Sequence, residues 1–355
     1  MRVLSVVGAR PQFIKSAPVS VALREAGVHE QIVHTGQHYD SNMSSVFFAE
    51  LEIAPPSHHL NAGSGTHAEQ TAIMLRGLER ILIDEAPDQI LVYGDTNSTL
   101  SGALAGAKLD IPICHVEAGV RSFNRAMPEE INRILTDRVA RLLLCPSETA
   151  KRHLKAEGIS SGVHVVGDVM RDALETFLPI SERTSRILQT LALEPSTYDL
   201  LTVHRAENTS DAVTLERIFR ALTMLGHHVI WPVHPRTRLV LERAAISPPR
   251  NVRLLDPVGY LDMLALEQSA RVVLTDSGGV QKEAYWLGVP CVTLREQTEW
   301  PETVEAGCNV LVGSHPAAID AAVRGMCESP PQNFGLPLYG AVGASARSAS
   351  LIAGL

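Results

Sequence analysis

Long apolar runs are missing from this sequence of 355 residues. A membrane-spanning helix needs about 20 consecutive apolar residues, and no stretch of the chain approaches that length. The apolar run at residues 3–7 is too short for the hydrophobic region of a secretion signal, and a turn follows it. We therefore expect a cytoplasmic protein that does not bind a membrane.

Closely spaced cysteines and clustered basic residues are also missing. No cysteine belongs to a CxxC pair, and most lie in apolar runs, which favours buried free thiols in a reducing compartment. The five cysteines are Cys114, Cys145, Cys291, Cys308 and Cys327. The formal net charge is -8 and the sequence contains no long basic run, so we expect no binding to nucleic acid.

Cofactor and metal motifs are absent as well. The sequence contains neither a GxxxxGK[ST] phosphate loop nor a GxSxG nucleophile motif. Residues 63–68 match GxGxxA, but no convincing strand precedes them, so we interpret them as a loop and a helix start. The adjacent histidine pairs at 58–59 and 227–228 lack the i,i+4 spacing of metal ligands on a helix. We expect neither a redox cofactor nor a metal ion.

The sequence does contain a regular alternation of short apolar runs with helix-length segments. Most runs are continuously apolar, as in strands buried on both faces of a parallel sheet. They lie at residues 3–7, 31–35, 89–93, 111–116, 142–145 and 163–166, and again at 200–203, 229–232, 252–255, 272–275 and 291–294. This order predicts the α/β class, with a doubly wound sheet in each half of the chain.

The two halves are predicted to be separate domains, since a domain typically has about 100–200 residues. We place the boundary after Asp168, where a helical connector begins, so that residues 1–168 form the first domain and 169–342 the second. A short helix at 343–355 is a candidate addition to the first domain. Ligands of such sheets bind beyond the carboxyl ends of the strands, so the polar residues that follow the predicted strands are the site candidates.

Two basic residues follow the first predicted strand. Gly8 permits a tight turn and Pro11 suits the first turn of a helix, so Arg10 and Lys15 lie at a helix N-terminus. Such an arrangement is a good phosphate site. A solvated basic helix start is the alternative interpretation.

Three acidic residues are candidates for proton transfer. Asp95 follows a predicted strand, where it either acts on the substrate or caps the next helix. Glu117 also follows an apolar strand, which suits it to general acid or base work; an internal ion pair with Arg121 is the alternative. Glu129 precedes Glu130 in a Pro-Glu-Glu run, which is also how a plain helix N-terminus looks.

A histidine and an arginine end the first predicted strand of the second half. His204 and Arg205 are adjacent, and such a pair at a strand end is suited to hold a pyrophosphate. His234 repeats the theme after the next strand. A structural histidine is the alternative in both places.

A glycine pair opens a helix after a later strand. Ser277 is followed by Gly278 and Gly279, which let backbone N–H groups approach a phosphate closely at the helix N-terminus. One turn later, Glu283 is placed to accept hydrogen bonds from ribose hydroxyls. A bare turn is the alternative, but the pattern favours a sugar-nucleotide site.

Ten motifs, in this order, resemble those of the non-hydrolysing UDP-N-acetylglucosamine 2-epimerases over nearly the whole chain. They are GARPQFIK, TGQHYD, YGDTNS, HVEAGVRSF, MPEEINR, HRAEN, HPRT, PVGYLDML, TDSGGVQKEA and PETVEAG. The resemblance implies two Rossmann-like domains in a GT-B arrangement, a substrate in the cleft between them, and a homodimer. The implied activity is interconversion of UDP-GlcNAc and UDP-ManNAc, with a UDP-amino sugar as the ligand and no cofactor.

The resemblance also implies roles for individual residues. Asp95, Glu117 and Glu129 would be the acid/base carboxylates, and His204 would complete the catalytic set beside the departing UDP. The implied substrate-binding residues are Arg10, Lys15, Arg121, Arg205, His234, Tyr260, Met263, Ser277, Gly278, Gly279, Glu283 and Arg295. In this scheme the glycine pair holds the diphosphate, Glu283 the ribose, and the turn at 258–261 lies near the uracil.

Some positions depart from the family pattern. Gln12 replaces a common Glu, and Trp300 follows Thr-Glu where Arg is frequent. Residues 39–43 replace a Gln-containing segment through which many bacterial members bind an activating UDP-GlcNAc, so we expect no strong allosteric activation. HYDxNM and TEW also resemble relatives that act on UDP-2,3-diacetamido-glucuronic acid, which stays as an alternative substrate.

The chemistry of the implied reaction matches the kinds of residue found. The C2 hydrogen of an N-acetylhexosamine is not acidic, because the ring carries no adjacent carbonyl. If UDP leaves from C1, oxocarbenium character acidifies that hydrogen, so the enzyme needs cations on the diphosphate and carboxylates near C2. A GT-B glycosyltransferase, a hydrolysing epimerase and a non-catalytic sugar-nucleotide sensor are the rival interpretations; a sensor would not need all three carboxylates.

Overall fold

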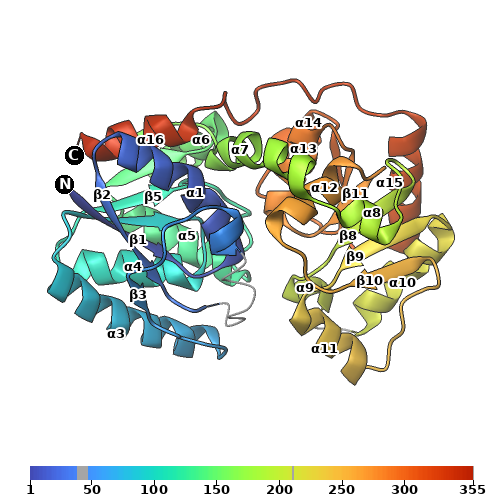
Figure 1. Cartoon of the computed structure of the whole chain (residues 1–355), viewed down its shortest axis with the longest axis horizontal. Helices are drawn as coiled ribbons and strands as arrows, with labels where there is room; N and C mark the ends of the chain where they lie inside the picture. The colour runs from blue at the N-terminus through green and yellow to red at the C-terminus, as the bar shows by residue number, and fades with distance from the viewer. Residues whose placement is uncertain (38–46, 210–211, 355) are drawn as a thin grey trace. The chain divides into compact units, whose positions relative to one another are not determined.

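The computed structural model describes residues 1–37, 47–209 and 212–354. The chain divides into two compact units: unit 1 is Met1–Thr176 with Tyr339–Leu355, and unit 2 is Phe177–Leu338 (Figure 1). Each unit is built on a parallel sheet with helices, so the predicted α/β class with two sheets is confirmed. Residues 39–43, on which the predicted lack of allosteric activation rests, lie outside the described residues.

The sheet of unit 1 has the strand order β3-β2-β1-β4-β5-β6-β7, and all neighbouring pairs are parallel. Every residue of β4 and β5 is buried, as the continuous apolar runs predict. The strands are β1 (Arg2–Val7), β2 (His29–His34), β3 (His58–His59), β4 (Gln89–Tyr93), β5 (Ile113–Val116), β6 (Leu142–Cys145) and β7 (Val163–Val165). The short β3 has no apolar run and no sequence signal predicts it.

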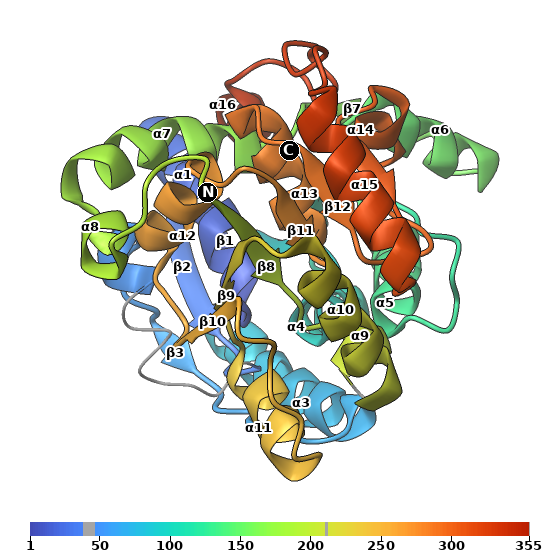
Figure 2. The ribbon, with the colours of Figure 1, turned by 90° about the vertical axis from the view of Figure 1, so that its right-hand side faces the viewer.

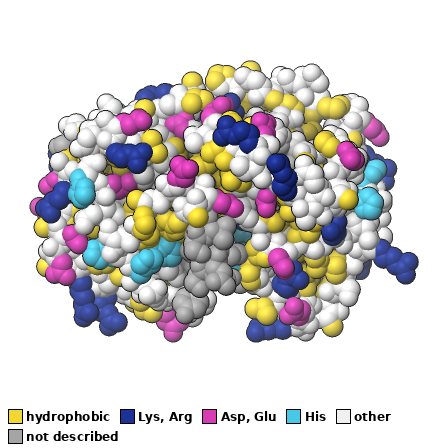
Figure 3. All heavy atoms as spheres, in the orientation of Figure 1, with side chains coloured by type: hydrophobic (Ala, Val, Ile, Leu, Met, Phe, Trp, Pro, Cys, Tyr) yellow, Lys and Arg dark blue, Asp and Glu magenta, His cyan; other side chains and the backbone are white. Residues whose placement is uncertain are grey.

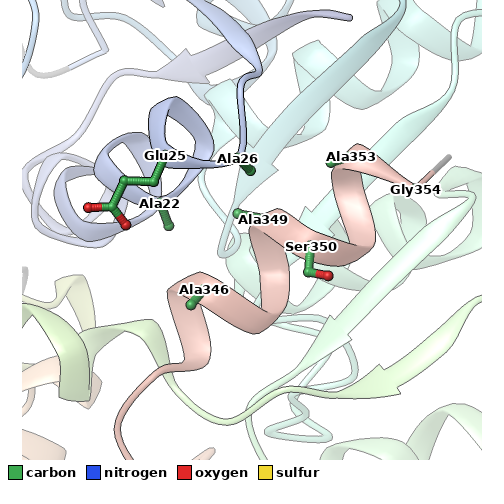
Figure 4. A pocket seen from close by; sticks show the side chains of 8 residues that line it. All are labelled: Ala22, Glu25, Ala26, Ala346, Ala349, Ser350, Ala353 and Gly354. Carbon is green, nitrogen blue, oxygen red and sulfur yellow. The ribbon is translucent and has the colours of Figure 1, made fainter.

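Helices cover both faces of this sheet. Helices α1 and α16 lie on one face, and α3 and α4 on the other (Figure 1). The helices of unit 1 are α1 (Arg10–Glu25), α3 (His67–Glu85), α4 (Asn97–Lys108), α5 (Pro128–Val139), α6 (Glu148–Ala156) and α16 (Ala344–Ala353). An open groove between α1 and α16 is lined mainly by alanines (Figure 4); it lies at the C-terminal end of α1, away from the predicted site residues at its N-terminal end.

The sheet of unit 2 has the strand order β10-β9-β8-β11-β12-β13, again with parallel pairing; most of this order can be followed in Figure 2. The strands are β8 (Tyr198–Thr202), β9 (His228–Pro232), β10 (Val252–Leu255), β11 (Val273–Thr275), β12 (Cys291–Thr293) and β13 (Asn309–Leu311). The helices are α8 (Ile187–Leu191), α9 (Ala206–Thr209), α10 (Ala212–Leu225), α11 (Pro235–Arg243), α12 (Tyr260–Gln268), α13 (Gly278–Leu287), α14 (Pro301–Glu305) and α15 (Pro316–Glu328).

Helix α7 (Val169–Thr184) passes from unit 1 into unit 2. Its beginning is tied to unit 1, because the Asp172 carboxylate accepts hydrogen bonds from the backbone N–H groups of Gly343 (2.7 Å) and Ser345 (2.6 Å). Further along, Phe177 packs edge-on against Tyr260, with ring centroids 5.9 Å apart. By these contacts the chain divides inside a continuous helix, between Thr176 and Phe177, and again at 338/339. Sequence pattern marks where a helix begins but not which unit each turn packs against.

The cysteines are not paired with one another, and the charged side chains of both signs are mixed on the surface shown in Figure 3. Four of the cysteines are buried and Cys327 is half-buried, all as free thiols, which confirms the predicted free state. None of the described helices combines the length and apolarity that a bilayer span requires. On the face shown in Figure 3, Lys and Arg side chains are scattered among acidic ones.

Candidate active site

The turn between β1 and α1 is held by Gln12. Its Oε1 accepts hydrogen bonds from the backbone N–H groups of Gly8 (2.8 Å) and Ala9 (3.1 Å). Its Nε2 donates to the carbonyl oxygen of Tyr93 (3.0 Å) and to the Thr99 hydroxyl (3.1 Å). The amide thus ties the end of β1 to the end of β4. An ionised glutamate here would accept the first pair but could not donate to the second.

Lys15 and Glu117 form an ion pair at the carboxyl ends of the strands. The Lys15 Nζ lies 2.6 Å from the Glu117 Oε1, and the side chains are only 10% and 8% exposed. The Glu117 backbone has φ +73°, a left-handed conformation that is strained for a non-glycine residue and often marks functional sites. The predicted alternative, a pair between Glu117 and Arg121, is wrong as to the partner, since the structure pairs Glu117 with Lys15.

Gly94 lies against this ion pair. A β-carbon on Gly94 would lie 3.2 Å from the Lys15 Nζ and 3.4 Å from the Glu117 Oε1, and the residue has φ +62°. Its N–H donates to the Val116 carbonyl oxygen (2.9 Å). Glycine therefore provides both the backbone conformation and the space that brings the ion pair onto the end of β4.

Asp95 follows Gly94 and pairs with a buried arginine. Its carboxylate contacts the Arg133 guanidinium, and its carbonyl oxygen accepts from the Asn132 side chain (2.9 Å). The carboxylate is 28% exposed, so it remains accessible. The N-cap of α4 is Thr96, so the interpretation of Asp95 as the helix cap is not correct.

The two acids at the start of α5 have different surroundings. Glu130 is buried and accepts hydrogen bonds from the Ser122 N–H and hydroxyl and from the Phe123 N–H, each 2.9 Å long. It also pairs with Arg133 (2.9 Å), so Glu130 is structural. Glu129 is half-buried at the second position of α5, and the contacts around Gly94 described above do not include it.

Arg10 and Arg121 also take different positions. Arg10 begins α1 and lies over the Phe47 ring, 4.9 Å from its centroid. Arg121 is 2% exposed and directs its guanidinium at Glu157 (2.7 and 2.9 Å) and at Asp137 (2.7 Å). These acids engage the buried guanidinium, and the role of Arg121 towards a substrate stays a prediction.

In unit 2, a buried aspartate holds the His-Arg pair that follows β8. The Asp276 carboxylate lies 3.1 Å from His204 Nδ1 and accepts from the N–H groups of His204 (3.1 and 3.2 Å) and Arg205 (3.0 Å). It also accepts from the Asn208 side chain (3.0 Å). The His204 side chain is 45% exposed, so Asp276 orients the imidazole from below while its other side stays open.

These contacts lower the pKa of Asp276 to about 2. Burial alone would raise the pKa, but His204, Asn208 and the Arg205 N–H outweigh it. Since an unfolded Asp has a pKa of about 3.9, ionised Asp276 stabilises the fold by about 2 kcal/mol above roughly pH 4, and this contribution is lost as the pH falls towards about 2.

The stability difference between the wild type and Asp276→Asn in urea unfolding should therefore shrink as the pH is lowered from about 6 to 3. A difference that is independent of pH would contradict this assignment.

A second arginine lies beneath this region. Arg295 is buried and forms a bidentate pair with Glu299 (2.8 and 2.9 Å), and Glu299 also lies 3.9 Å from Arg205. The guanidinium of Arg295 is 1% exposed. The observed contact of Arg295 supports Glu299, and its role towards a substrate stays a prediction.

The N-terminus of α13 is built from Ser277, Gly278 and Gly279. Ser277 is the N-cap, and its hydroxyl accepts from the Val280 N–H. A β-carbon on Gly278 would lie 2.7 Å from the Trp300 Nε1, so Trp300 requires glycine there. The same indole ring covers the buried Lys282, whose Nζ is 3.5 Å from the ring centroid, a cation–π contact that keeps positive charge near this helix start.

The remaining residues that are predicted to contact the substrate lie on α12 and α13 and just before α11. The Tyr260 hydroxyl donates to the Glu283 carboxylate (2.8 Å), so two residues that are predicted to bind the substrate contact each other. Met263 is 5% exposed within a hydrophobic cluster that includes Leu266, so its side chain belongs to the core. His234 precedes α11 and is half-buried. The roles of Tyr260, Glu283, Met263 and His234 towards a ligand stay predictions.

The family description UDP-N-acetylglucosamine 2-epimerase matches residues 21–353. The chain belongs to this 2-epimerase family. Its identity with a UDP-N-acetylglucosamine 2-epimerase homolog of Methanococcus maripaludis is 55% over 90% of each chain. It is also 49% identical, over 100% of both chains, to the UDP-2,3-diacetamido-2,3-dideoxy-D-glucuronate 2-epimerase of Pseudomonas aeruginosa. The resemblance of the sequence motifs is thereby confirmed.

A solved structure gives the same result for the fold. This 2-epimerase family member matches the Methanocaldococcus jannaschii UDP-GlcNAc 2-epimerase, solved in complex with UDP-GlcNAc and UDP, with a TM-score of 0.94 and 41% identity over 99% of each chain. The prediction of an enzyme of this isomerase family is confirmed.

Some residues that build the site are missed by sequence reasoning. Arg133, Asp276 and Trp300 occur in the quoted motifs, but nothing in their spacing says that they hold Asp95, His204 and Lys282. Only for Asp276 does a signal exist, since it directly follows a strand. His115 is the fourth such residue, and its contacts are described below.

Proposed function

We propose that this chain inverts C2 of a UDP-2-acetamido sugar and interconverts UDP-GlcNAc and UDP-ManNAc. The carrying observation is that Lys15, on α1, and Glu117, directly after β5, pair beside Gly94. Asp95 follows Gly94 after β4. Positioned carboxylates can act as general base and general acid at C2 once departure of UDP acidifies its hydrogen. Membership of the family supports the same reaction class.

In the proposed reaction, UDP leaves from C1 with the bonding electron pair, and a carboxylate removes the proton from C2. A C1=C2 double bond forms, so the intermediates are a glycal and UDP. Protonation of C2 from the opposite face and re-formation of the C1–O bond then give the epimer. Asp95, Glu117 and Glu129 are the proposed acid/base groups, and no redox change occurs at any step.

Unit 2 supplies groups suited to the nucleotide. The N–H groups at the start of α13 and the His204–Arg205 pair favour a diphosphate. Glu283, oriented by Tyr260 (2.8 Å), is the proposed acceptor for the ribose hydroxyls. We propose that Ser277, Gly278 and Gly279 hold the diphosphate and that His204 and Arg205 stabilise its charge as UDP departs.

A second substrate is favoured by one specific observation. The Pseudomonas aeruginosa relative matches the whole chain at 49% identity, against 44% over 91% of this chain for the Methanocaldococcus jannaschii UDP-N-acetylglucosamine 2-epimerase. UDP-2,3-diacetamido-glucuronate is therefore the alternative. Comparison of kcat/KM for the two sugar nucleotides decides between them, and the larger value identifies the substrate.

Solvent isotope incorporation tests the proposed chemistry. With UDP-GlcNAc in deuterated water and no added NAD or metal ion, we expect deuterium at C2 of the product, because the removed proton exchanges on a carboxylate. Proton NMR of the isolated UDP-ManNAc measures it. Full retention of the original hydrogen, or activity only with added NAD, would exclude elimination and re-addition. The same measurement should be made with the diacetamido-glucuronate nucleotide if UDP-GlcNAc is not turned over.

We also propose a cytoplasmic homodimer. Cytoplasmic sugar nucleotides are the substrates that this chemistry requires, and the family resemblance implies two copies. Light scattering after size-exclusion chromatography measures the mass directly against the 38.4 kDa chain. A monomer mass at micromolar concentration would contradict the dimer.

A further inference from the structure

His115, on β5, is completely buried and makes two short contacts. Its Nδ1 lies 2.7 Å from the Asp137 Oδ1, and its Nε2 lies 2.7 Å from the carbonyl oxygen of Gly94. The side chains of His115 and Asp137 are both 0% exposed. Each ring nitrogen therefore has one protein oxygen at hydrogen-bond distance.

Both nitrogens of this ring must carry a proton. A carbonyl oxygen only accepts hydrogen bonds, so Nε2 is the donor to Gly94. A carboxylate also only accepts, so Nδ1 is the donor to Asp137. In a neutral imidazole, one nitrogen lone pair would face an oxygen lone pair at 2.7 Å.

Asp137 is ionised in this arrangement. Its Oδ2 accepts from the Gly119 N–H (3.1 Å) and lies 2.7 Å from Arg121. Burial by itself would raise the pKa of Asp137, but the pKa is lowered overall. The Arg121 guanidinium and the Gly119 N–H are donors that favour the ionised carboxylate independently of His115. The neighbouring Cys145 thiol, on β6, is neutral, since burial raises its pKa to about 12.

The cluster is balanced only if His115 is charged. Asp137 and Glu157 carry negative charge, and Arg121, which pairs with both, carries one positive charge. A positive His115 brings the sum to zero, whereas a neutral ring would leave one negative charge in excess in a largely buried cluster. The hydrogen bonds and the charges of the cluster therefore both favour a doubly protonated His115.

The charged ring holds the backbone that carries the proposed acid/base groups. Gly94 is held by two hydrogen bonds. Its N–H donates to the Val116 carbonyl oxygen (2.9 Å), and its own carbonyl oxygen accepts from His115 Nε2. Asp95 follows this peptide directly, and the Lys15–Glu117 pair lies against Gly94. We propose that His115 is a doubly protonated positioning residue, which holds the Gly94 peptide and thereby sets Asp95 and Glu117 for proton transfer at C2. The part that concerns catalysis rests on the proposed function; the protonation state does not.

Nitrogen-15 NMR of the ligand-free protein tests the protonation state directly. The protein is labelled with [15N]histidine, and long-range proton–nitrogen spectra are recorded from about pH 6 to 9. We expect one histidine whose two ring nitrogens both have the shift of a protonated nitrogen at neutral pH. Its assignment to His115 comes from its loss in His115→Gln or its displacement in Asp137→Asn. A ring with one unprotonated nitrogen at neutral pH would overturn the proposal.

Asp137→Asn is the matched variant. Its side-chain NH2 can donate to Nδ1, which allows a neutral His115 that still donates from Nε2 to Gly94. The charges of Arg121 and Glu157 then balance each other. We expect the Nδ1 signal to become that of an unprotonated nitrogen, while the chain stays folded. An unchanged, doubly protonated ring in Asp137→Asn would contradict the hydrogen-bond counting.

The positioning role is tested by kinetics and binding together. His115→Gln should lower kcat by roughly 10–100-fold, the size expected when reacting groups are misplaced by about 1 Å, and Asp137→Asn should lower it less, because the Gly94 contact remains. UDP affinity, measured by calorimetry, should stay within about twofold. If His115→Gln lowers only the melting temperature and keeps kcat, His115 is merely structural. If the wild type has no epimerase activity, the proposed function fails, yet the NMR result still decides the charge of His115.

Discussion

Glu117→Gln and Asp95→Asn are each expected to lower kcat by about 10²–10⁴-fold while changing KM little. Both substitutions keep the shape of the side chain and remove its charge. The Lys15 Nζ can still donate to the amide oxygen at position 117, so a hydrogen bond replaces the ion pair seen at 2.6 Å. Because Lys15 then keeps its charge without the anion, Glu117→Gln should also lower the melting temperature. The substitutions then remove stabilisation of the transition state, in which the protons move, and leave substrate binding largely unchanged. Steady-state kinetics and thermal unfolding of each purified variant measure both quantities.

Three comparisons make this result specific. Glu79→Gln, on the exposed surface of α3, is the matched control and should leave kcat unchanged. Ser277→Ala should mainly weaken UDP binding, because Ser277 would touch the diphosphate before and during the reaction. Glu129→Gln decides between catalysis and helix capping at that position: near-normal kcat with a lower melting temperature identifies a cap. If Asp95→Asn, Glu117→Gln and Glu129→Gln all stay active, the carboxylate mechanism is wrong.

Lys15→Met is expected to lower the free energy of unfolding by about 3 kcal/mol, although the new side chain is apolar and similar in length. The reason is that Glu117 stays behind, 8% exposed and without the cation 2.6 Å away, and breaking a buried ion pair from one side is strongly destabilising. Urea unfolding of Lys15→Met against the wild type measures the loss. Lys108→Met, at the exposed end of α4, is the matched control and should stay within about 0.5 kcal/mol of the wild type.

The double variant Lys15→Met/Glu117→Gln completes the test. Because the buried charge is then gone, it should recover much of the stability lost in Lys15→Met, so the two substitutions should be strongly non-additive. Additive effects would mean that Lys15 stabilises unit 1 through other contacts. The double variant should remain inactive in either case, which separates stability from catalysis.

Much of the fold could be predicted from the sequence because the strands of parallel sheets are continuous apolar runs. Strands such as β4 and β5 are buried along their whole length, and this burial leaves a direct mark on composition. The two-residue β3 leaves no such mark. The place where the chain divides could not be predicted either, since it depends on which residues the two halves of α7 contact.

The site could be predicted only as far as strand ends and helix starts show it. Glu117, Asp95, His204 and Ser277 are found because polar residues after apolar strands are conspicuous. Their partners are distant in sequence: Lys15 pairs across 102 positions and Asp276 lies 72 positions from His204. The partners of Arg121 are hidden in the same way, because nothing in its motif indicates that Asp137 and Glu157 engage it.

The division of the chain has a consequence for synthesis on the ribosome. Unit 2 is one continuous segment, Phe177–Leu338, placed inside the sequence of unit 1. Helix α16, which packs on α1 and whose Ile352 carbonyl accepts a hydrogen bond from Gln89 (3.2 Å), is therefore translated only after all of unit 2. Domains generally fold as units during synthesis, N-terminal first, but unit 1 can be completed only after α16 has been made. Until then the surface of α1 on which α16 packs stays uncovered. The nascent protein thus reverses the usual order: the part translated first is the last to be completed.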